Sequence, residues 1–287
     1  MLSFVYQLTQ SQKNEVNFMH DANDSRHPIS NRLLAVLPPT EFAFIQPHLK
    51  EVVYEPGTML ARAGDTLRTC FFPNGGMVSL LCVTEQGRSV EAGFTGFEGM
   101  IGVSVILRKN EMPYDALVQA STPGFTVDAK VVLDLFNRGG VFHDATLRFA
   151  YVILKQMSQT CVCNHYHTIE SRLCRWLTVM CERSNNRHLK VTQEFLAHML
   201  GVQRTSIGMI ANSIQRTGAI RYARGRVEII DLERIRASAC DCYRIIREEQ
   251  DKYLTDSNFT MSDIRQTNVG DMRDTNLASP QELSSGT

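Results

Sequence analysis

The sequence lacks the features that send a chain into or across a membrane. No stretch approaches the roughly 20 consecutive apolar residues that a membrane span requires. The opening segment, MLSFVYQLTQSQKNE, has no basic start followed by a long apolar run and a small-residue cleavage site, so it does not resemble a secretion signal. We therefore expect a cytoplasmic protein with no membrane partner.

Cysteine pairs of the C-x-x-C type are also missing. The eight cysteines are scattered along 287 residues, which favours reduced thiols over disulfides. Two C-x-C pairs occur, Cys161-x-Cys163 and Cys240-x-Cys242. We interpret them as small buried side chains, although a thiolate exposed near Arg would instead make them oxidant sensors. The sequence predicts no metal site.

Net charge is absent as well, because 30 basic residues balance 30 acidic ones. The balance is uneven along the chain, since residues 168–247 carry 14 Arg and Lys against 7 Asp and Glu. A basic segment suits a polyanion such as nucleic acid, although a solvated surface would have the same composition. The length allows one large domain or two modest domains, and we expect two.

Turn signals divide the N-terminal half into short segments. Between residues 47 and 127, Gly, Pro and Asn clusters recur about every 8–12 residues, with β-rich runs such as Met77–Val83 between them. This spacing predicts a sandwich or a barrel-like roll. Residues 1–27 and 248–287 are polar without a sustained period and are predicted to be mobile tails.

The spacing of apolar residues changes after the predicted roll. No Gly or Pro occurs between residues 142 and 165, which predicts one long helix over residues 141–167. Apolar side chains recur along it at alternating intervals of three and four, the pattern of a coiled-coil seam, which favours a homodimer. Packing of the helix on its own roll is the alternative. The predicted dimer interface consists of Leu147, Ala150, Leu154, Met157 and Cys161.

Residues 193–215 (QEFLAHMLGVQRTSIGMIANSIQ) carry the most specific pattern in the chain. A helix-turn-helix needs a small residue inside its first helix, a residue that tolerates a left-handed backbone at the turn, and apolar inward positions. Ala197 and Gly201 meet the first two requirements. The inward positions are filled by Leu196, Leu200, Val202, Ile207 and Ile210.

The second helix of this motif is predicted to begin near Arg204 and to read DNA. Its exposed N-terminal end would enter the major groove, where Arg204 can bind a guanine through two hydrogen bonds. A hairpin over residues 220–230 follows and places Arg224 and Arg226 at its tip, like a wing that contacts the DNA backbone. The predicted DNA-binding residues are Thr192, Gln193, Gln203, Arg204, Thr205, Ser206, Asn212, Arg224 and Arg226.

The order of these parts resembles the Crp/Fnr family of transcription regulators over roughly residues 30–245. The shared motifs include Tyr54-Glu55-Pro56-Gly57, Glu85-Gln86-Gly87-Arg88, Gly99-Met100-Ile101-Gly102, Glu170-Ser171-Arg172-Leu173 and the Leu200–Ile207 stretch LGVQRTSI. The resemblance implies an α+β fold: a double-stranded β-helix of the cyclic-nucleotide-binding type (28–140), a dimerisation helix (141–167) and a winged helix-turn-helix (168–247). It further implies a homodimer on a palindromic operator, with RNA polymerase as a partner.

Departures from the family pattern indicate which effectors the roll can bind. Nucleotide-binding members carry Gly-Glu and later Arg-Ser-Ala or Arg-Thr-Ala, where this chain has Gly102-Val103 and Tyr114-Asp115-Ala116. Without the Arg, a cyclic phosphate loses its charge partner, so we do not expect control by cyclic AMP. The roll either is empty or holds a less charged, unidentified effector in a predicted pocket of Val103, Ser104, Tyr114 and Ser158.

Cofactor-dependent versions of the family fit less well. The iron–sulfur type needs a cluster of N-terminal cysteines, and no cysteine precedes Cys70. Haem would need an axial ligand aimed into the roll, whereas His143, His165 and His167 lie on or beside the long helix and are interpreted as structural. We therefore expect no cofactor.

Two other classes of protein were weighed against a DNA-binding regulator. An enzyme built on a cupin-like barrel would need His or carboxylate ligands along its strands, and residues 47–127 contain only one histidine, His48. No catalytic residue is therefore predicted. A binding module that senses a small molecule and regulates a protein partner remains the alternative.

Overall fold

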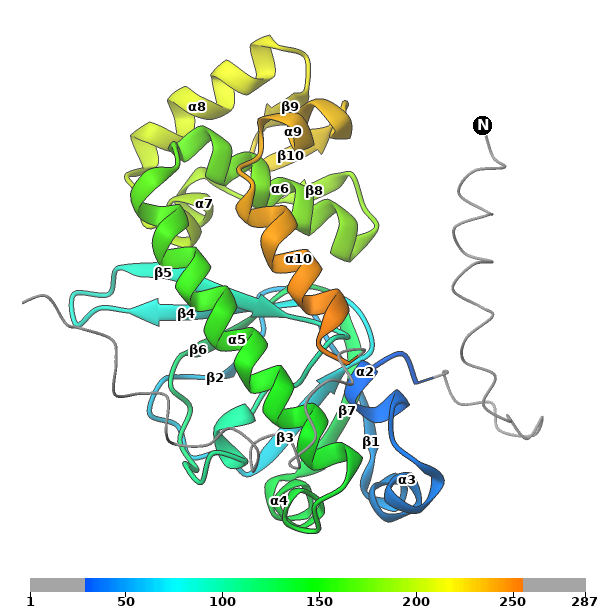
Figure 1. The fold of residues 1–287 in the computed structure, drawn as a ribbon. Coiled ribbons are helices and arrows are strands. Elements are labelled where there is room, and N and C mark those ends of the chain that lie inside the picture. Colours follow the sequence, from blue (N-terminus) through cyan, green and yellow to red (C-terminus); the bar gives the residue numbers. More distant parts are fainter. Residues whose placement is uncertain (1–28, 255–287) are drawn as a thin grey trace, which may run out of the picture.

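The computed structural model describes residues 29–254 and has the α+β architecture predicted for the chain (Figure 1). The predicted tail at residues 1–27, and most of the C-terminal one, lie outside the described residues. Within residues 29–254, no helix is both long and apolar enough to cross a membrane.

The N-terminal domain is an antiparallel roll made of two sheets, with strand orders β1-β7-β3 and β2-β6-β4-β5. Large apolar side chains such as Phe71, Phe72 and Met100 fill its interior. Its strands are β1 (Lys50–Tyr54), β2 (Met59–Ala61), β3 (Thr69–Pro73), β4 (Met77–Val83), β5 (Ser89–Thr95), β6 (Asp115–Ala120) and β7 (Thr122–Asp128). Short helices border it: α2 (Arg32–Ala35), α3 (Pro39–Ile45), η1 (Gln46–His48), η2 (Val103–Val105) and α4 (Ala129–Asn137).

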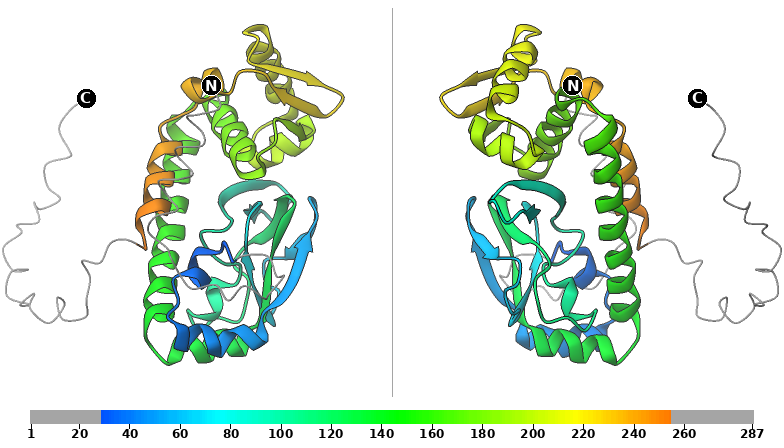
Figure 2. Two further views of the ribbon diagram at one scale, coloured as in Figure 1. Left: turned by 90° about the vertical axis from the view of Figure 1, so that its right-hand side faces the viewer. Right: turned by 90° about the vertical axis from the view of Figure 1, so that its left-hand side faces the viewer.

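Helix α5 (Val141–Tyr166) runs along the roll and continues beyond it toward the second domain (Figure 2). Its first turn is held by Glu41, whose carboxylate accepts hydrogen bonds from the Val141 and Phe142 amides at 2.9 and 2.8 Å. One face packs on the roll through buried side chains that include Phe149 and Val152.

The C-terminal domain surrounds a second core that contains Trp176, Leu196 and Ile207. Its sheet has the order β8-β10-β9, and β9 and β10 form the predicted hairpin. The elements are α6 (Ile169–Ser184), β8 (His188–Lys190), α7 (Gln193–Leu200), α8 (Arg204–Arg216), β9 (Ile220–Ala223), β10 (Arg226–Ile229) and α9 (Leu232–Ser238).

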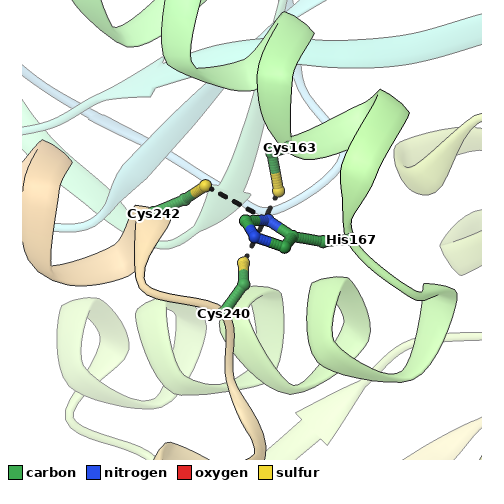
Figure 3. Close-up of side chains that lie close together, drawn as sticks. All are labelled: Cys163, His167, Cys240 and Cys242. Atoms are coloured by element: carbon green, nitrogen blue, oxygen red, sulfur yellow. Dashed lines mark hydrogen bonds between the residues drawn. The ribbon is translucent and has the colours of Figure 1, made fainter.

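The sequence after the hairpin predicts one final helix from Leu232, but this prediction is wrong, because the chain breaks at residues 239–241 and begins α10 (Cys242–Lys252). This break lies beside the C-terminal end of α5. There Cys240 and Cys242 meet Cys163 and His167 (Figure 3). From this point α10 turns back along α5 toward the roll (Figure 2).

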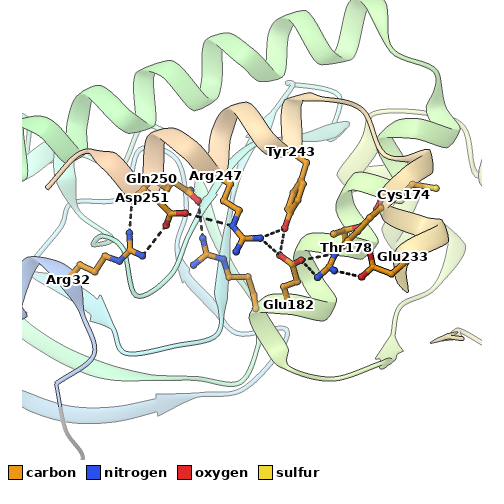
Figure 4. Close-up of polar contacts among 11 residues, drawn as sticks. Arg32, Cys174, Thr178, Glu182, Glu233, Tyr243, Arg247, Gln250 and Asp251 are labelled. Carbon is orange, nitrogen blue, oxygen red and sulfur yellow. Dashed lines mark hydrogen bonds and ion pairs between the residues drawn. The ribbon is translucent and has the colours of Figure 1, made fainter. Parts of the chain in front are cut away.

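The predicted start of the C-terminal tail at residue 248 is also wrong. Residues 248–252 are helical, and Tyr253 is buried against the roll and donates a hydrogen bond to the Glu98 carbonyl. The Gln250 side chain accepts a hydrogen bond from Arg183 at 3.0 Å (Figure 4) and donates one to Glu98 at 3.3 Å. Helix α10 is therefore anchored by these polar contacts as well as by buried Ile246 and Tyr253.

Candidate nucleic-acid interface

Helices α7 and α8 form the predicted helix-turn-helix. Thr192 caps α7 by accepting a hydrogen bond from the Phe195 amide at 3.1 Å. Gly201 ends α7 with φ of 63° and ψ of 39°, so the expected left-handed turn residue is confirmed. Ala197 is buried where the two helices approach each other, and the Val202 amide donates to its carbonyl at 3.0 Å.

The N-terminal end of α8 faces solvent. Gln203, Arg204 and Thr205 are exposed and Ser206 is half-buried. Gln203 makes no side-chain cap, so the first amides of α8 have no capping side-chain oxygen there. The end of the helix that would read bases is therefore uncovered within this protomer.

One residue on α8 escaped the sequence prediction of DNA contacts. Met209 is 68% exposed, and it lies on the same face of α8 as Thr205 and Asn212, four and three residues away. An exposed apolar side chain on a recognition helix can contact a thymine methyl group.

A groove of about 560 Å³ lies between the start of α7, the start of α8 and the β9–β10 hairpin. It brings together four predicted DNA-binding residues, Thr192, Gln193, Arg204 and Arg224. The hairpin approaches closely because Gly225 has φ of 72°, and a Cβ there would lie 3.3 Å from the Thr192 methyl group. The structure does not place Arg226 in this groove, since it lines a neighbouring groove with Lys190 and Arg221.

The arginines of this surface are available to an anion. Within residues 29–254, no carboxylate forms an ion pair with Arg204, Arg224 or Arg226, whereas Arg221 pairs with Glu228 at 2.7 Å. Burial raises the pKa of Tyr222, against the opposing effect of the Arg204 charge. The Tyr222 hydroxyl therefore stays protonated and donates to the Val191 carbonyl at 3.2 Å, which fixes the hairpin to the segment that precedes α7.

The roll contacts the helix-turn-helix at the end of α7. A Cβ on Gly201 would lie 3.1 Å from Val90 Cγ2 on β5, and Gln119 on β6 donates to the Met199 sulfur at 3.5 Å. Arg172 of α6 donates to the Leu200 carbonyl at the end of α7. The position of the helix-turn-helix therefore depends on contacts with both domains.

The structure does not bring the residues of the predicted effector pocket together. Val103, Ser104 and Tyr114 are buried within the roll, but Ser158 is exposed on α5, with its hydroxyl bonded to the Leu154 carbonyl at 2.9 Å. Gln156 points toward the roll instead and accepts a hydrogen bond from the Phe94 amide at 2.9 Å. Within this protomer Ser158 therefore does not line the roll, because the inward face of α5 passes through Gln156.

Some residues of the predicted dimer interface are exposed to solvent, and the others pack on the roll. Leu147 and Leu154 are 41% and 65% exposed, and Cys161 is exposed too. Ala150 and Met157 are partly buried against the core of the roll. One face of α5 therefore packs on the roll, and the opposite face is an exposed apolar stripe. Tyr151, Val162 and Tyr166 also belong to this stripe.

A cavity of about 570 Å³ between the roll, α6 and α10 was not foreseen from the sequence. Arg32 pairs there with Asp251 at 3.0 Å, and Arg183 pairs with Glu98 at 2.5 Å. The lining comes from four separate segments of the chain, so no local motif could indicate it.

This architecture defines a class: a cyclic-nucleotide-binding-type domain joined by a long helix to a helix-turn-helix with a wing. Residues 51–139 match the family profile described as cyclic nucleotide-binding domain, and residues 171–238 match that of the Crp-like helix-turn-helix domain. The chain belongs to the Crp/Fnr family of transcriptional regulators.

Solved structures share this fold. A protein from Eubacterium rectale, described as a transcriptional regulator of the Crp/Fnr family, is similar with a TM-score of 0.60 at 17% identity, over 73% of this chain and 98% of its own. The c-di-GMP-responsive global regulator CLP of Xanthomonas campestris gives a TM-score of 0.55 at 16% identity, over 67% and 99%. FixK2 of Bradyrhizobium japonicum gives 0.55 at 11% identity, over 67% and 98%. A search of curated protein sequences found no match.

Proposed function

We propose that this regulator is a cytoplasmic homodimer that binds an approximately palindromic DNA operator and affects transcription together with RNA polymerase. It acts by binding rather than by catalysis. The observation that carries the proposal is the solvent-facing N-terminal end of α8, with the unpaired Arg204 beside a groove that contains Arg224.

The contacts fall into two kinds. Arg204 reads a base edge in the major groove, and the fork of its guanidinium matches the two acceptors of guanine. Thr192, Gln193 and Arg224 bind phosphate oxygens and set the position of the protein on the duplex. The start of α7 adds backbone N–H groups to this phosphate site.

The dimer forms through the exposed stripe of α5. Leu147 and Leu154 repeat at seven residues, which keeps them on the same side of a helix that supercoils with its twin. Two recognition helices related by this axis read half-sites about 10 base pairs apart, one turn of the duplex.

Cyclic AMP does not control this regulator under the proposal. The Asp115 carboxylate accepts a hydrogen bond from the Ala63 amide at 2.8 Å and lies 3.7 Å from Arg62. The neighbouring Tyr114 is buried and un-ionised, because burial raises its pKa. A cyclic phosphate at this place would meet a carboxylate rather than a buried guanidinium.

The test begins with selection of bound fragments from genomic DNA, which should enrich one palindrome. On that sequence Arg204→Ala should lose about 1–3 kcal/mol of specific binding, roughly 5- to 150-fold in Kd. Arg224→Ala should weaken binding to all sequences alike and lower the salt dependence by about one released counterion.

Arg68→Ala is the matched control, because Arg68 is exposed on the roll at β3, far from α8 in sequence and structure. It should bind like the wild type. Selection without an enriched sequence, or an Arg204→Ala variant with unchanged specific affinity, would overturn the proposal and favour a module that regulates a protein partner.

A further inference from the structure

Four side chains with metal-binding atoms converge where α5 ends and α10 begins. Cys163 lies in the last turn of α5, His167 follows that helix, and Cys240 and Cys242 flank the start of α10. Their sulfur and nitrogen atoms all lie within 4.8 Å of one another. Figure 3 shows the four side chains close together, with Cys163 and His167 at the end of α5 and Cys240 and Cys242 at the start of α10.

The spacing fits a single tetrahedral ion. Ligand atoms about 2.0–2.3 Å from Zn²⁺ at tetrahedral corners lie roughly 3.3–3.8 Å apart. The Cys163 and Cys240 sulfurs are 3.5 Å apart, and the Cys242 sulfur is 3.4 Å from His167 Nδ1. Thiolates that bind different iron atoms of a cluster lie farther apart than this.

The surroundings of the four residues are those of a metal site. His167 Nε2 lies 3.4 Å from the Asp241 carboxylate, which leaves Nδ1 as the ligand atom and orients the ring. Gln159 donates a hydrogen bond to the Cys242 sulfur at 3.1 Å. Outer contacts of this kind to a ligating imidazole and a ligating sulfur fix the geometry of structural zinc sites.

The local charge favours thiolates. The buried guanidinium of Arg175 exerts a favourable electrostatic effect on thiolates at Cys163 and Cys240. Three thiolates with Zn²⁺ would leave one negative charge, which the buried Arg175 guanidinium offsets.

We propose that Cys163, His167, Cys240 and Cys242 form a structural zinc site. Four protein ligands leave no open position, which is typical of a structural rather than a catalytic ion. Each thiol loses its proton to solvent when it binds the metal, so affinity falls as the pH falls. The ion joins residues 77 positions apart and ties the end of α5 to the segment that leaves the winged domain.

The test uses the full reduced chain. Protein purified without chelators should contain one zinc per chain by elemental analysis. The metal-free protein should bind one Co²⁺ and show the intense visible absorption and the thiolate charge-transfer band of a tetrahedral site. Chelation should lower the Tm of the wild type. The Cys240→Ser variant should hold less than a tenth of the wild-type zinc, and its Tm should not respond to chelation.

Cys82→Ser and Cys161→Ser are the matched controls, since both cysteines are exposed and lie outside the four-residue cluster. They should keep the zinc and the Co²⁺ spectrum. The proposal fails if the reduced wild type binds neither ion in a one-to-one ratio. It also fails if protein isolated without oxygen carries an iron–sulfur chromophore, or if a Cys163–Cys240 disulfide forms and the chain binds no Co²⁺ after its reduction. The readout is independent of DNA binding.

Discussion

Gly201 occupies a position that two separate constraints reserve for glycine. Its φ of 63° lies in the left-handed region, and the place of a Cβ is 3.1 Å from Val90 Cγ2. Gly218 has φ of 77°, with no heavy atom within 4 Å of the place of its Cβ. The pair therefore separates the cost of the backbone angle from the cost of the contact.

We predict that Gly218→Ala lowers the free energy of unfolding by about 1–2 kcal/mol, the cost of a left-handed backbone for an L-residue. Gly201→Ala should lose more, because its methyl group also presses on Val90. Adding Val90→Ala should recover the excess in a double-mutant cycle. Urea unfolding measures all of these changes, and equal losses in the two single variants would show that the contact with the roll adds nothing.

Helix α10 connects the second domain to the first through its last two turns. Tyr253 is buried against Phe149 with ring centroids 6.2 Å apart, and its hydroxyl bonds the Glu98 carbonyl. Its removal should leave both a cavity and an unsatisfied carbonyl.

We expect Tyr253→Ala to cost about 3–5 kcal/mol, as for other large aromatic side chains in a core. Tyr253→Phe should cost only about 1 kcal/mol, since it keeps the ring and loses one hydrogen bond. Thermal melting should therefore rank wild type, Phe and Ala in that order. If Ala and Phe were equivalent, the ring would not be supporting the end of α10.

The helices could be predicted from the sequence where apolar side chains repeat at regular intervals. They could not be predicted where the residues that contact them are distant in sequence. The period of α5 and the Ala197–Gly201 pattern identify their elements because local spacing alone determines which face is buried. The end of α10 could not be predicted, because its anchors, Glu98 and Arg183, are far away in sequence. The metal-binding cluster could not be predicted for the same reason: Cys163 and His167 meet Cys240 and Cys242 only in the folded chain.

For the whole molecule, the exposed stripe of α5 is the feature that a partner copy would cover. Leu154 is 65% exposed and lies near the middle of the helix. A charge introduced there faces solvent in a monomer, but it would be buried between two copies at considerable cost.

We predict that Leu154→Lys converts a dimer into a monomer in sedimentation experiments at micromolar concentration, and that it weakens operator binding without changing the fold. Val53→Lys is the control, because Val53 is 58% exposed on β1 of the roll. It should remain dimeric. A wild-type chain that sediments as a monomer, or a Leu154→Lys variant that stays dimeric, would contradict this use of α5.

The length of α5 determines how far a small tilt would move its C-terminal end. A helix of 26 residues is about 39 Å long at 1.5 Å per residue. In the proposed dimer, a tilt of about 5° about the Glu41-capped end would move the far end of the helix by roughly 3 Å. A displacement of that size would change the distance between the two α8 helices, and with it their fit to half-sites on one duplex.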